Sequence, residues 1–308
     1  MGKDKAGRKG SAGFEAFYSA AFGERWPDLR AALLSPVRQV ARINRFAEPT
    51  YVEAKSKGFS IADFAGSWAL LLNEGKRVEI ATDERGLSDF YVMDPASIVA
   101  ARALAVEPGD EVLDLCAAPG GKSLILAESI GEGRLVSNEI SDRRRARLRA
   151  VLEDYLPSEV LGRVTVTGHD ATRWCLHETD AYDRILLDAP CSGERHLLAS
   201  PEELKLWSPA RSKNLAVRQY ALLAGALAVV RPGGRIVYST CSISPLENDA
   251  VIARLLKKRE GEARVIPLTF EMGEPTEYGC MILPDRTGYG PIYFAVIERL
   301  SHPETSSS

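Results

Sequence analysis

The stretch "DEVLDLCAAPGGK", residues 110–122, decides the fold class. A short apolar strand, "DEVLDLC", runs into a glycine pair, and the following "KSLILAESI" predicts a helix. A second strand is predicted at 133–139, and a second helix at 141–156 with Ser141 as its N-cap. Because strand–helix units with near-continuous apolar strands repeat, the sequence predicts a parallel, doubly wound α/β sheet.

The rest of the chain continues this alternation but begins with a different pattern. Further strands are predicted at 163–170, 182–190, 234–242, 263–270 and 291–300, and further helices at 215–230 and 245–260. Residues 12–85 instead carry apolar residues three and four apart, as in "SIADFAGSWALLLN" (60–73), which predicts helices. We therefore expect four parts: a disordered basic tail (1–11), a helical N-terminal region (12–85), a catalytic domain (86–300) and a disordered tail (301–308).

Composition and charge limit the class of protein. The 308 residues carry a net charge of −3, and the longest apolar stretch, at 220–230, is too short to span a bilayer. Five cysteines without close pairing argue against a disulfide framework and for a reducing compartment, and none stands at zinc-ligand spacing, so no metal is predicted. Two arginine-rich runs, at 25–46 and 141–149, are either solvated helix faces or a basic surface for nucleic acid.

Chemically active residue types stand at the carboxyl ends of the predicted strands, where doubly wound sheets bind ligands. These ends read "DLCAAPGGK", Glu139, "HDATRW", "DAPCSG" and "STCS" in chain order. Gly120 and Gly121 let the backbone approach a ligand closely, yet neither phosphate-loop nor dinucleotide spacing is present. Glu139 follows the second strand, where an acid accepts ribose hydroxyls. This pattern fits a nucleoside without a pyrophosphate, such as S-adenosylmethionine.

The motifs "DLCAAPGGK", "DAPCSG" and "YSTCS", preceded by "YVMDPAS", resemble those of the Nop/Sun family of RNA cytosine-5 methyltransferases. The resemblance covers about residues 85–300, and the ends of the chain are similar to the mitochondrial ribosomal-RNA branch. It implies a Rossmann-like class I methyltransferase domain. Two departures stand out, because Glu139 replaces the usual Asp and "GYGPIYF" replaces the usual D-G-F-F ending.

The resemblance also implies a set of residues for S-adenosylmethionine. Glu139 would hold the ribose with Arg144 nearby, Asp170 and Ala171 would contact the adenine, and Asp188 would lie beside the methionine part and the target base. The glycine-loop contacts would be Cys116, Ala117, Ala118, Pro119, Gly120, Gly121 and Lys122. Asp170 as a strand-end cap and Arg144 as a surface charge are the simpler alternatives, and Asp94 and Ser97 either line the active-site edge or cap a helix.

The same resemblance assigns roles to two cysteines. A thiolate that adds to carbon 6 of cytosine makes carbon 5 nucleophilic enough to accept a methyl group. In the RNA family the thiol of the Thr-Cys motif attacks, so Cys241 is the expected nucleophile and Cys191 the helper in product release. Asp188 is the expected acid at ring nitrogen 3. The sequence does not indicate what activates Cys241, and Cys116, Cys175 and Cys280 are interpreted as small buried residues.

The long connection at 194–214 contains Arg195, His196, Trp207, Arg211 and Lys213, which suits single-stranded RNA if the segment is an open loop. The expected substrate is small-subunit ribosomal RNA, with transfer RNA second, and the helical region would position it, with a protein partner or inside a ribosomal particle. We expect a monomer that does not bind membranes, in the cytoplasm, or in mitochondria if the source is eukaryotic.

Three other functions compete with this hypothesis. A DNA cytosine-5 methyltransferase would use Cys191 as the nucleophile, but its usual F-x-G-x-G motif is missing. A non-catalytic RNA-binding factor for ribosome assembly would not need two thiols and Asp188. A nicotinamide-dependent oxidoreductase shares the fold class but is disfavoured by the glycine spacing.

Overall fold

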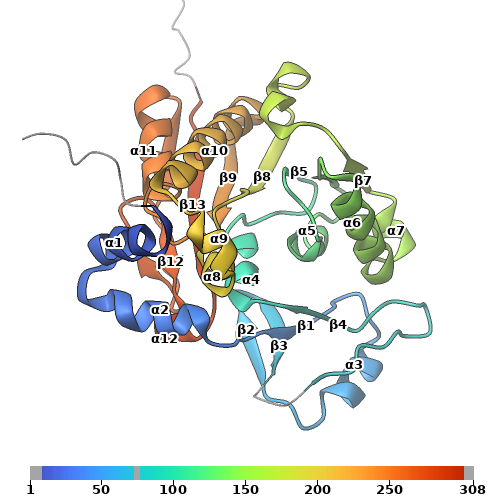
Figure 1. The fold of residues 1–308 in the computed structure, drawn as a ribbon. Helices are drawn as coiled ribbons and strands as arrows, with labels where there is room; N and C mark the ends of the chain where they lie inside the picture. The colour runs from blue at the N-terminus through green and yellow to red at the C-terminus, as the bar shows by residue number, and fades with distance from the viewer. Residues whose placement is uncertain (1–8, 73–76, 302–308) are drawn as a thin grey trace, which may run out of the picture.

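A computed structural model describes residues 9–72 and 77–301, and its centre is a nine-stranded sheet with the strand order β11-β12-β13-β9-β8-β5-β6-β7, in which β10 also pairs with β13 (Figure 1). The five strands from β9 to β7 run parallel, which confirms the predicted architecture. The strands are β5 (Glu111–Asp114), β6 (Arg134–Asn138), β7 (Val164–Thr167), β8 (Tyr182–Asp188), β9 (Val230–Thr240), β10 (Ala263–Ile266), β11 (Glu274–Pro275), β12 (Cys280–Ile282) and β13 (Ile292–Arg299). The strands after β9 join the sheet antiparallel and complete it.

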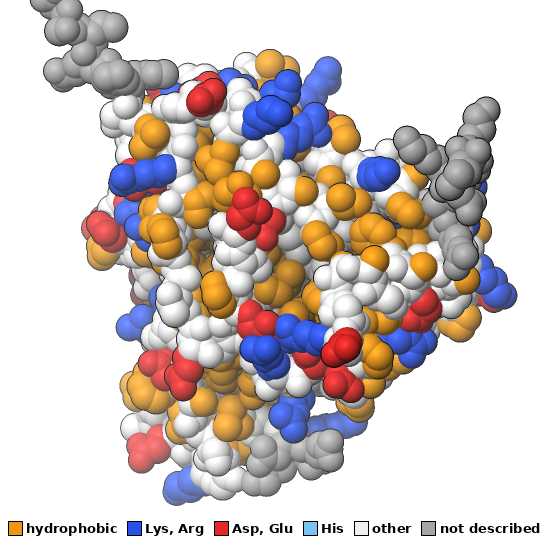
Figure 2. Space-filling model, turned by 90° about the vertical axis from the view of Figure 1, so that its left-hand side faces the viewer, with side chains coloured by type: hydrophobic (Ala, Val, Ile, Leu, Met, Phe, Trp, Pro, Cys, Tyr) orange, Lys and Arg blue, Asp and Glu red, His pale blue; other side chains and the backbone are white. Residues whose placement is uncertain are grey.

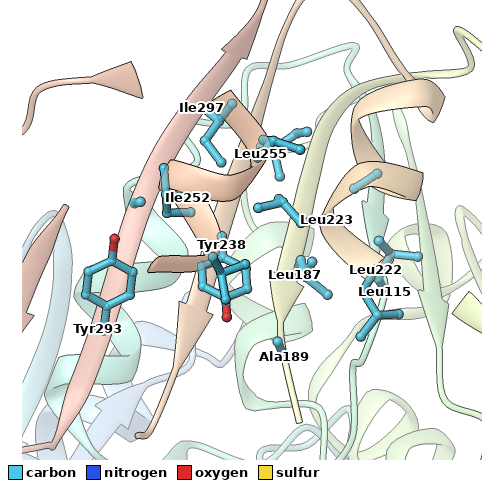
Figure 3. Close-up of a cluster of buried hydrophobic side chains, with 14 of the residues drawn as sticks. Leu115, Leu187, Ala189, Leu222, Leu223, Tyr238, Ile252, Leu255, Tyr293 and Ile297 are labelled. Atoms are coloured by element: carbon cyan, nitrogen blue, oxygen red, sulfur yellow. The ribbon is translucent and has the colours of Figure 1, made fainter. Parts of the chain in front are cut away.

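Both faces of the parallel sheet are buried, which explains why its strands read as continuous apolar runs. Ile185 and Leu187 belong to one hydrophobic cluster, while Leu186 between them belongs to the other. Figure 3 shows the first cluster, where Leu187 and Tyr238 of the sheet face α10 (Pro209–Val229) and α11 (Asp249–Lys258). The opposite face is covered by α4 (Pro95–Arg102), α5 (Gly121–Ala127) and α6 (Asp142–Tyr155), followed by the short α7 (Ser158–Leu161). No helix among the described residues is long and apolar enough to cross a membrane.

The prediction that residues 12–85 are helical is wrong in part, because three strands lie among them. Helices α1 (Gly10–Phe22), η1 (Gly23–Arg25), α2 (Trp26–Leu34) and α3 (Pro49–Ser56) are present, and α1 already includes residues 10 and 11 of the predicted tail. A four-stranded antiparallel sheet with the order β2-β3-β1-β4 occupies the rest. Its strands are β1 (Val40–Ile43), β2 (Ile61–Phe64), β3 (Ser67–Leu71) and β4 (Phe90–Met93). The other predicted tail residues, 1–8 and 302–308, lie outside the described residues.

The segment "SIADFAGSWALLLN" forms the hairpin of β2 and β3 rather than a helix. Ala65 and Gly66 form its two-residue turn, and both have positive φ angles, 53° and 84°. Such turns match the twist of paired strands. The apolar residues follow the helical spacing by coincidence, and pairing of β3 with β1 buries Leu70 completely. Contacts distant in the sequence therefore override the local pattern.

The prediction of a long loop at 194–214 is also wrong, because this segment folds into α8 (Glu194–Ala199), α9 (Pro201–Lys205) and the start of α10. Trp207 is fully buried, and its ring lies 5.4 Å from that of Phe14 and 5.6 Å from that of Phe17, both in α1. The backbone of Gly10 donates to the Trp207 carbonyl at 2.8 Å. Trp207 therefore anchors the N-terminal helix and is not available to stack on a base.

Candidate active site

The glycine loop lies between the end of β5 and the start of α5, as the sequence predicts. Gly120 has a φ of +120°, and a Cβ at this position would lie 2.9 Å from a methyl carbon of Val151 on α6. A residue with a side chain would be strained there and would also push α6 away. Only glycine lets the loop turn this closely against α6.

A cavity of about 300 Å³ opens beside this loop. Its wall includes seven of the predicted residues, namely Cys116, Ala117, Ala118, Pro119, Gly121, Lys122 and Asp188. The opposite wall comes from the N-terminal sheet, where Tyr91 and Met93 of β4 lie beside Gln39. A Cβ on Gly121 would lie 2.5 Å from the Tyr91 ring. Gly121 therefore makes room first for Tyr91, the first residue of the motif "YVMDPAS", which was not among the predicted site residues.

Asp114, at the end of β5, is a second residue that the sequence analysis missed. Its side chain is buried in the cavity wall, and Oδ2 accepts a 2.7 Å hydrogen bond from Ser123 Oγ. Oδ1 has no hydrogen-bond partner among the described residues. Burial, reinforced by the nearby charge of Asp188, raises the Asp114 pKa to about 7. An unpartnered buried carboxyl oxygen beside a glycine loop fits a ligand that brings a hydrogen-bond donor, such as the ammonium group of S-adenosylmethionine.

Asp188, at the end of β8, is held by two neighbours. Lys122 Nζ lies 2.7 Å from Oδ2, and Ser239 Oγ donates to Oδ1 at 2.8 Å. Burial alone would lower the Lys122 pKa, but the adjacent Asp188 carboxylate outweighs it and the pKa is raised. Lys122 is therefore a fixed cation at the base of the cavity, and it orients the Asp188 carboxylate.

The structure brings the two predicted cysteines into contact. The Sγ atoms of Cys191 and Cys241 lie 2.9 Å apart, although they are 50 residues apart in sequence. Cys241 is exposed and Cys191 is partly buried. The hydrogen bond with Cys241, together with burial, raises the Cys191 pKa well above its ordinary value. The more accessible thiol therefore belongs to the Thr-Cys motif.

Glu139 and Arg144 also meet, but next to the cavity and not in its lining. Arg144 Nη1 lies 3.0 Å from Glu139 Oε2, and Nη2 donates to the Ala118 carbonyl of the glycine loop at 2.8 Å. Glu139 Oε1 accepts from the backbone of Ser141, whose own side chain makes no capping bond. The pair connects the end of β6 to the loop.

Asp170 and Ala171 do not line this cavity. Asp170 is the N-cap of η2 (Ala171–Leu176), where Oδ1 accepts from the backbone and hydroxyl of Thr172, and these bonds lower its pKa. The structure thus places Asp170 in the capping position that the sequence analysis kept as the simpler alternative. The role of both residues at an adenine remains a prediction.

The two residues predicted at the active-site edge, Ser97 and Asp94, have different positions. Ser97 lines the cavity, whereas Asp94 caps α4 through Ala96 and also accepts from the Gly290 backbone at 2.8 Å. Cys116 lines the cavity as well, but burial and nearby carboxylates raise its pKa to about 12. It is therefore a wall residue and not a nucleophile.

Most arginines of the first arginine-rich run form ion pairs with acidic residues of the protein itself. Arg25 bonds to Glu274 and Asp285, Arg30 pairs with Glu15, and the buried Arg42 pairs with Glu128. Figure 2 shows the face that carries α1 and α2, where basic and acidic side chains are interspersed among hydrophobic ones. In the second run, Arg147 lines the cavity. The first run is therefore not a continuous basic surface.

Comparisons with known proteins agree with this geometry. A family model described as "16S rRNA methyltransferase RsmB/F" matches residues 101–298. The 5-cytosine rRNA methyltransferase NSUN4 of Bos taurus is 34% identical over 338 residues, covering 94% of this chain and 88% of that protein. The mitochondrial tRNA (cytosine(34)-C(5))-methyltransferase of Danio rerio is 33% identical, covering 80% and 72%. The structure of a methyltransferase homologue from Pyrococcus horikoshii has a TM-score of 0.75 at 26% identity and covers 94% of each chain.

The sheet, the glycine loop and the cavity define a class I methyltransferase that uses S-adenosylmethionine. The length of the family match, and the sequence identity to relatives over most of their length, identify the protein further. The chain belongs to the RsmB/F, or Nop/Sun, family of RNA cytosine-5 methyltransferases, and it is similar to the mitochondrial ribosomal-RNA branch.

Proposed function

We propose that this protein methylates carbon 5 of a cytosine in small-subunit ribosomal RNA through a covalent bond between Cys241 and the base. The observation that carries the proposal is the pair of contacting thiols next to the Lys122–Asp188 ion pair. A binding protein has no use for an exposed thiol in such a setting, whereas covalent catalysis requires one. The named rRNA relatives favour ribosomal RNA as the substrate.

Each side chain has one task in this mechanism. Cys241 adds to carbon 6 of the flipped-out cytosine. Asp188, which Lys122 and Ser239 orient as a carboxylate, takes up a proton and delivers it to ring nitrogen 3. When bound, S-adenosylmethionine supplies the methyl group that carbon 5 accepts. Glu139, the glycine loop and Asp114 hold that cofactor. After methyl transfer the proton on carbon 5 leaves and the bond between carbon 6 and the Cys241 sulfur breaks, which restores the double bond of the ring, and Cys191 assists this release.

The test uses tritiated methyl transfer from S-adenosylmethionine to purified RNA fractions. The wild-type protein should label RNA, and Cys241→Ser should abolish labelling because a hydroxyl is a weak nucleophile at neutral pH. Cys191→Ser should accumulate an RNA–protein adduct that survives a denaturing gel, and the double variant should form none. Cys175→Ser, a cysteine outside the site, is the matched control and should behave like wild type.

Two outcomes would change the proposal. Adducts in Cys241→Ser but not in Cys191→Ser would reverse the roles and point to the order used by DNA enzymes. Labelling of transfer RNA instead of ribosomal RNA would favour the second candidate substrate, which the relative from Danio rerio supports. A mitochondrial location in a eukaryotic source, and targeting by a protein partner or a ribosomal particle, belong to the same proposal and can be tested by fractionation.

A further inference from the structure

Behind the two cysteines lies a buried acidic pair that the proposed mechanism does not use. Glu194 is fully buried at the start of α8. Its Oε1 accepts from Tyr18 Oη at 2.6 Å, from Ser242 Oγ at 3.1 Å and from Ser192 Oγ, and its Oε2 accepts from the Ile243 backbone at 3.0 Å. Every partner is a donor, so the site is built for an oxygen acceptor and not for an amide.

Glu247 is the second member of the pair and is also fully buried. Its Oε2 accepts from the Ser192 backbone and from Gln219 Nε2, both at 3.0 Å. Its Oε1 has no hydrogen-bond partner, and no Lys or Arg pairs with either glutamate within residues 9–72 and 77–301. The pair is therefore a region of negative charge without a cation.

These carboxylates hold both cysteine loops at once. Ser192 directly follows Cys191, Ser242 directly follows Cys241, and the two serine hydroxyls lie 3.1 Å apart. Both hydroxyls also bond to Glu194. The position of each thiol thus depends on one carboxylate.

The surroundings of the two thiols carry opposite charges. The Lys122 cation interacts electrostatically with Cys241. The raised pKa of Cys191 comes first from its hydrogen bond with Cys241 and from burial, and the charges of Glu194 and Glu247 add to this effect. Burial and the charge of Glu247 raise the Glu194 pKa, while its bonds to Ser192, Tyr18 and Ile243 oppose that rise. Other ionisable groups lie near these side chains. Tyr238 interacts electrostatically with Cys191, Asp188 pairs with Lys122, and Tyr18 donates to Glu194.

We propose that Glu194 is a positioning residue that, together with Glu247, keeps the proton of the thiol pair on Cys191 and leaves Cys241 as the thiolate. One proton leaves the pair to solvent, and the remaining proton stays on the Cys191 sulfur and is shared with Cys241. This inference rests on the cysteine roles of the proposed function and explains how two thiols in contact take different roles. Tyr18 of α1 supports it by donating to Glu194.

The test measures thiol ionisation directly, without RNA or cofactor. Iodoacetamide alkylates thiolates, and peptide mass spectrometry separates the five cysteines. In Cys191→Ala the remaining Cys241 should be alkylated with a lower pH midpoint than Cys191 shows in Cys241→Ala, by about one unit or more. Glu194→Gln in the Cys241→Ala background should lower the Cys191 midpoint by about one unit. In the Cys191→Ala background, Glu194→Gln should shift the pH midpoint of Cys241 alkylation by a smaller amount.

Two further variants keep the test decisive. Glu202→Gln removes an exposed charge from α9 and should move neither midpoint. Tyr18→Phe removes one donor from Glu194, which favours the neutral carboxyl, so it should lower the Cys191 midpoint in the same direction by a smaller amount. It serves as the test if Glu194→Gln does not fold.

The proposal is overturned if Cys191 alone is alkylated at or below the pH of Cys241. It is equally overturned if Cys191 keeps its midpoint in folded Glu194→Gln or Tyr18→Phe. Because the readout needs no methyl transfer, such a failure leaves the proposed function standing. If the protein transfers no methyl group to RNA although both cysteines are alkylated with the expected pH midpoints, the result counts against the proposed function and not against this inference.

Discussion

Two pairs of carboxyl groups, one in the cavity and one behind the two cysteines, have different surroundings. On the cavity side, Asp188 is paired with Lys122 at 2.7 Å, and Asp114 is neutralised by its own proton near pH 7. On the buried side, Glu194 and Glu247 have only neutral hydrogen-bond donors. Placing a cation beside a carboxylate costs little free energy where solvent reaches the site. In the core, hydroxyls and backbone amides must stabilise the negative charge instead. The thiol pair therefore lies between an ion pair on the cavity side and two carboxyl groups without a cation among the described residues on the buried side.

The buried side depends on α1 staying in place, and Trp207 is its anchor. Trp207→Ala should lower the free energy of unfolding by about 3–5 kcal/mol, because it removes a fully buried ring from the aromatic cluster. Urea unfolding followed by fluorescence or circular dichroism measures the change. Trp207→Phe keeps a ring and removes an indole N–H that has no partner, so its loss should be much smaller. A loss below about 1 kcal/mol in the alanine variant would show that α1 is loosely attached.

The cavity side depends on its cation. Lys122→Met should lower kcat/KM for methyl transfer by about 100-fold, equivalent to about 2.7 kcal/mol, because Asp188 loses its ion pair and its orientation. Lys122→Arg keeps the charge and should retain more activity. Equal activities of Lys122→Met and wild type, within threefold, would mean that the two sides do not differ in the way described.

On the cavity side, the raised pKa of Asp114 can be tested by measuring how the free energy of unfolding depends on pH. Burial raises its folded-state pKa from 3.8 to about 7, so the folded protein holds a proton that the unfolded chain releases. The contribution of Asp114 to stability therefore falls as the pH rises from about 4 to above 7. Asp114→Asn should remove this dependence and stabilise the protein at pH 8.

The expected gain for Asp114→Asn is about 1–2 kcal/mol, below the roughly 4 kcal/mol that the full shift corresponds to, because the bond from Ser123 is partly lost. Urea unfolding at pH 5 and pH 8 measures it. Glu153→Gln, an exposed change on α6, should show no such pH dependence. Parallel pH profiles for Asp114→Asn and wild type would contradict the raised pKa.

The parallel sheet and the glycine loop were predictable because their signals are local. Strand, glycine pair and helix follow one another in residues 110–127. Cys191 directly follows one predicted strand, and Cys241 stands at the end of another. The hairpin at 61–71 was missed because its stability comes from β1, and Trp207 was assigned to an open loop because its partners Phe14 and Phe17 are nearly 200 residues away. Residue type and order cannot reveal such contacts.

The site was predictable to the same extent. The motifs placed Lys122, Asp188 and both cysteines correctly side by side. Tyr91 was missed because it comes from a second sheet that the sequence did not predict. Glu194 and Glu247 were missed because an acidic residue near the start of a helix usually serves the helix dipole, and nothing local distinguishes a carboxylate that bonds to two cysteine loops.

The hydrogen bond from Tyr18 to Glu194 joins residues 176 positions apart. During synthesis, α1 leaves the ribosome long before α8 and α9, against which it packs. At about 5–20 residues per second, its aromatic face waits roughly 10–35 s for its partners. The nascent chain therefore exposes Phe14, Tyr18 and Trp26 for that time, and the surroundings of its thiols are complete only when α1 has met α8.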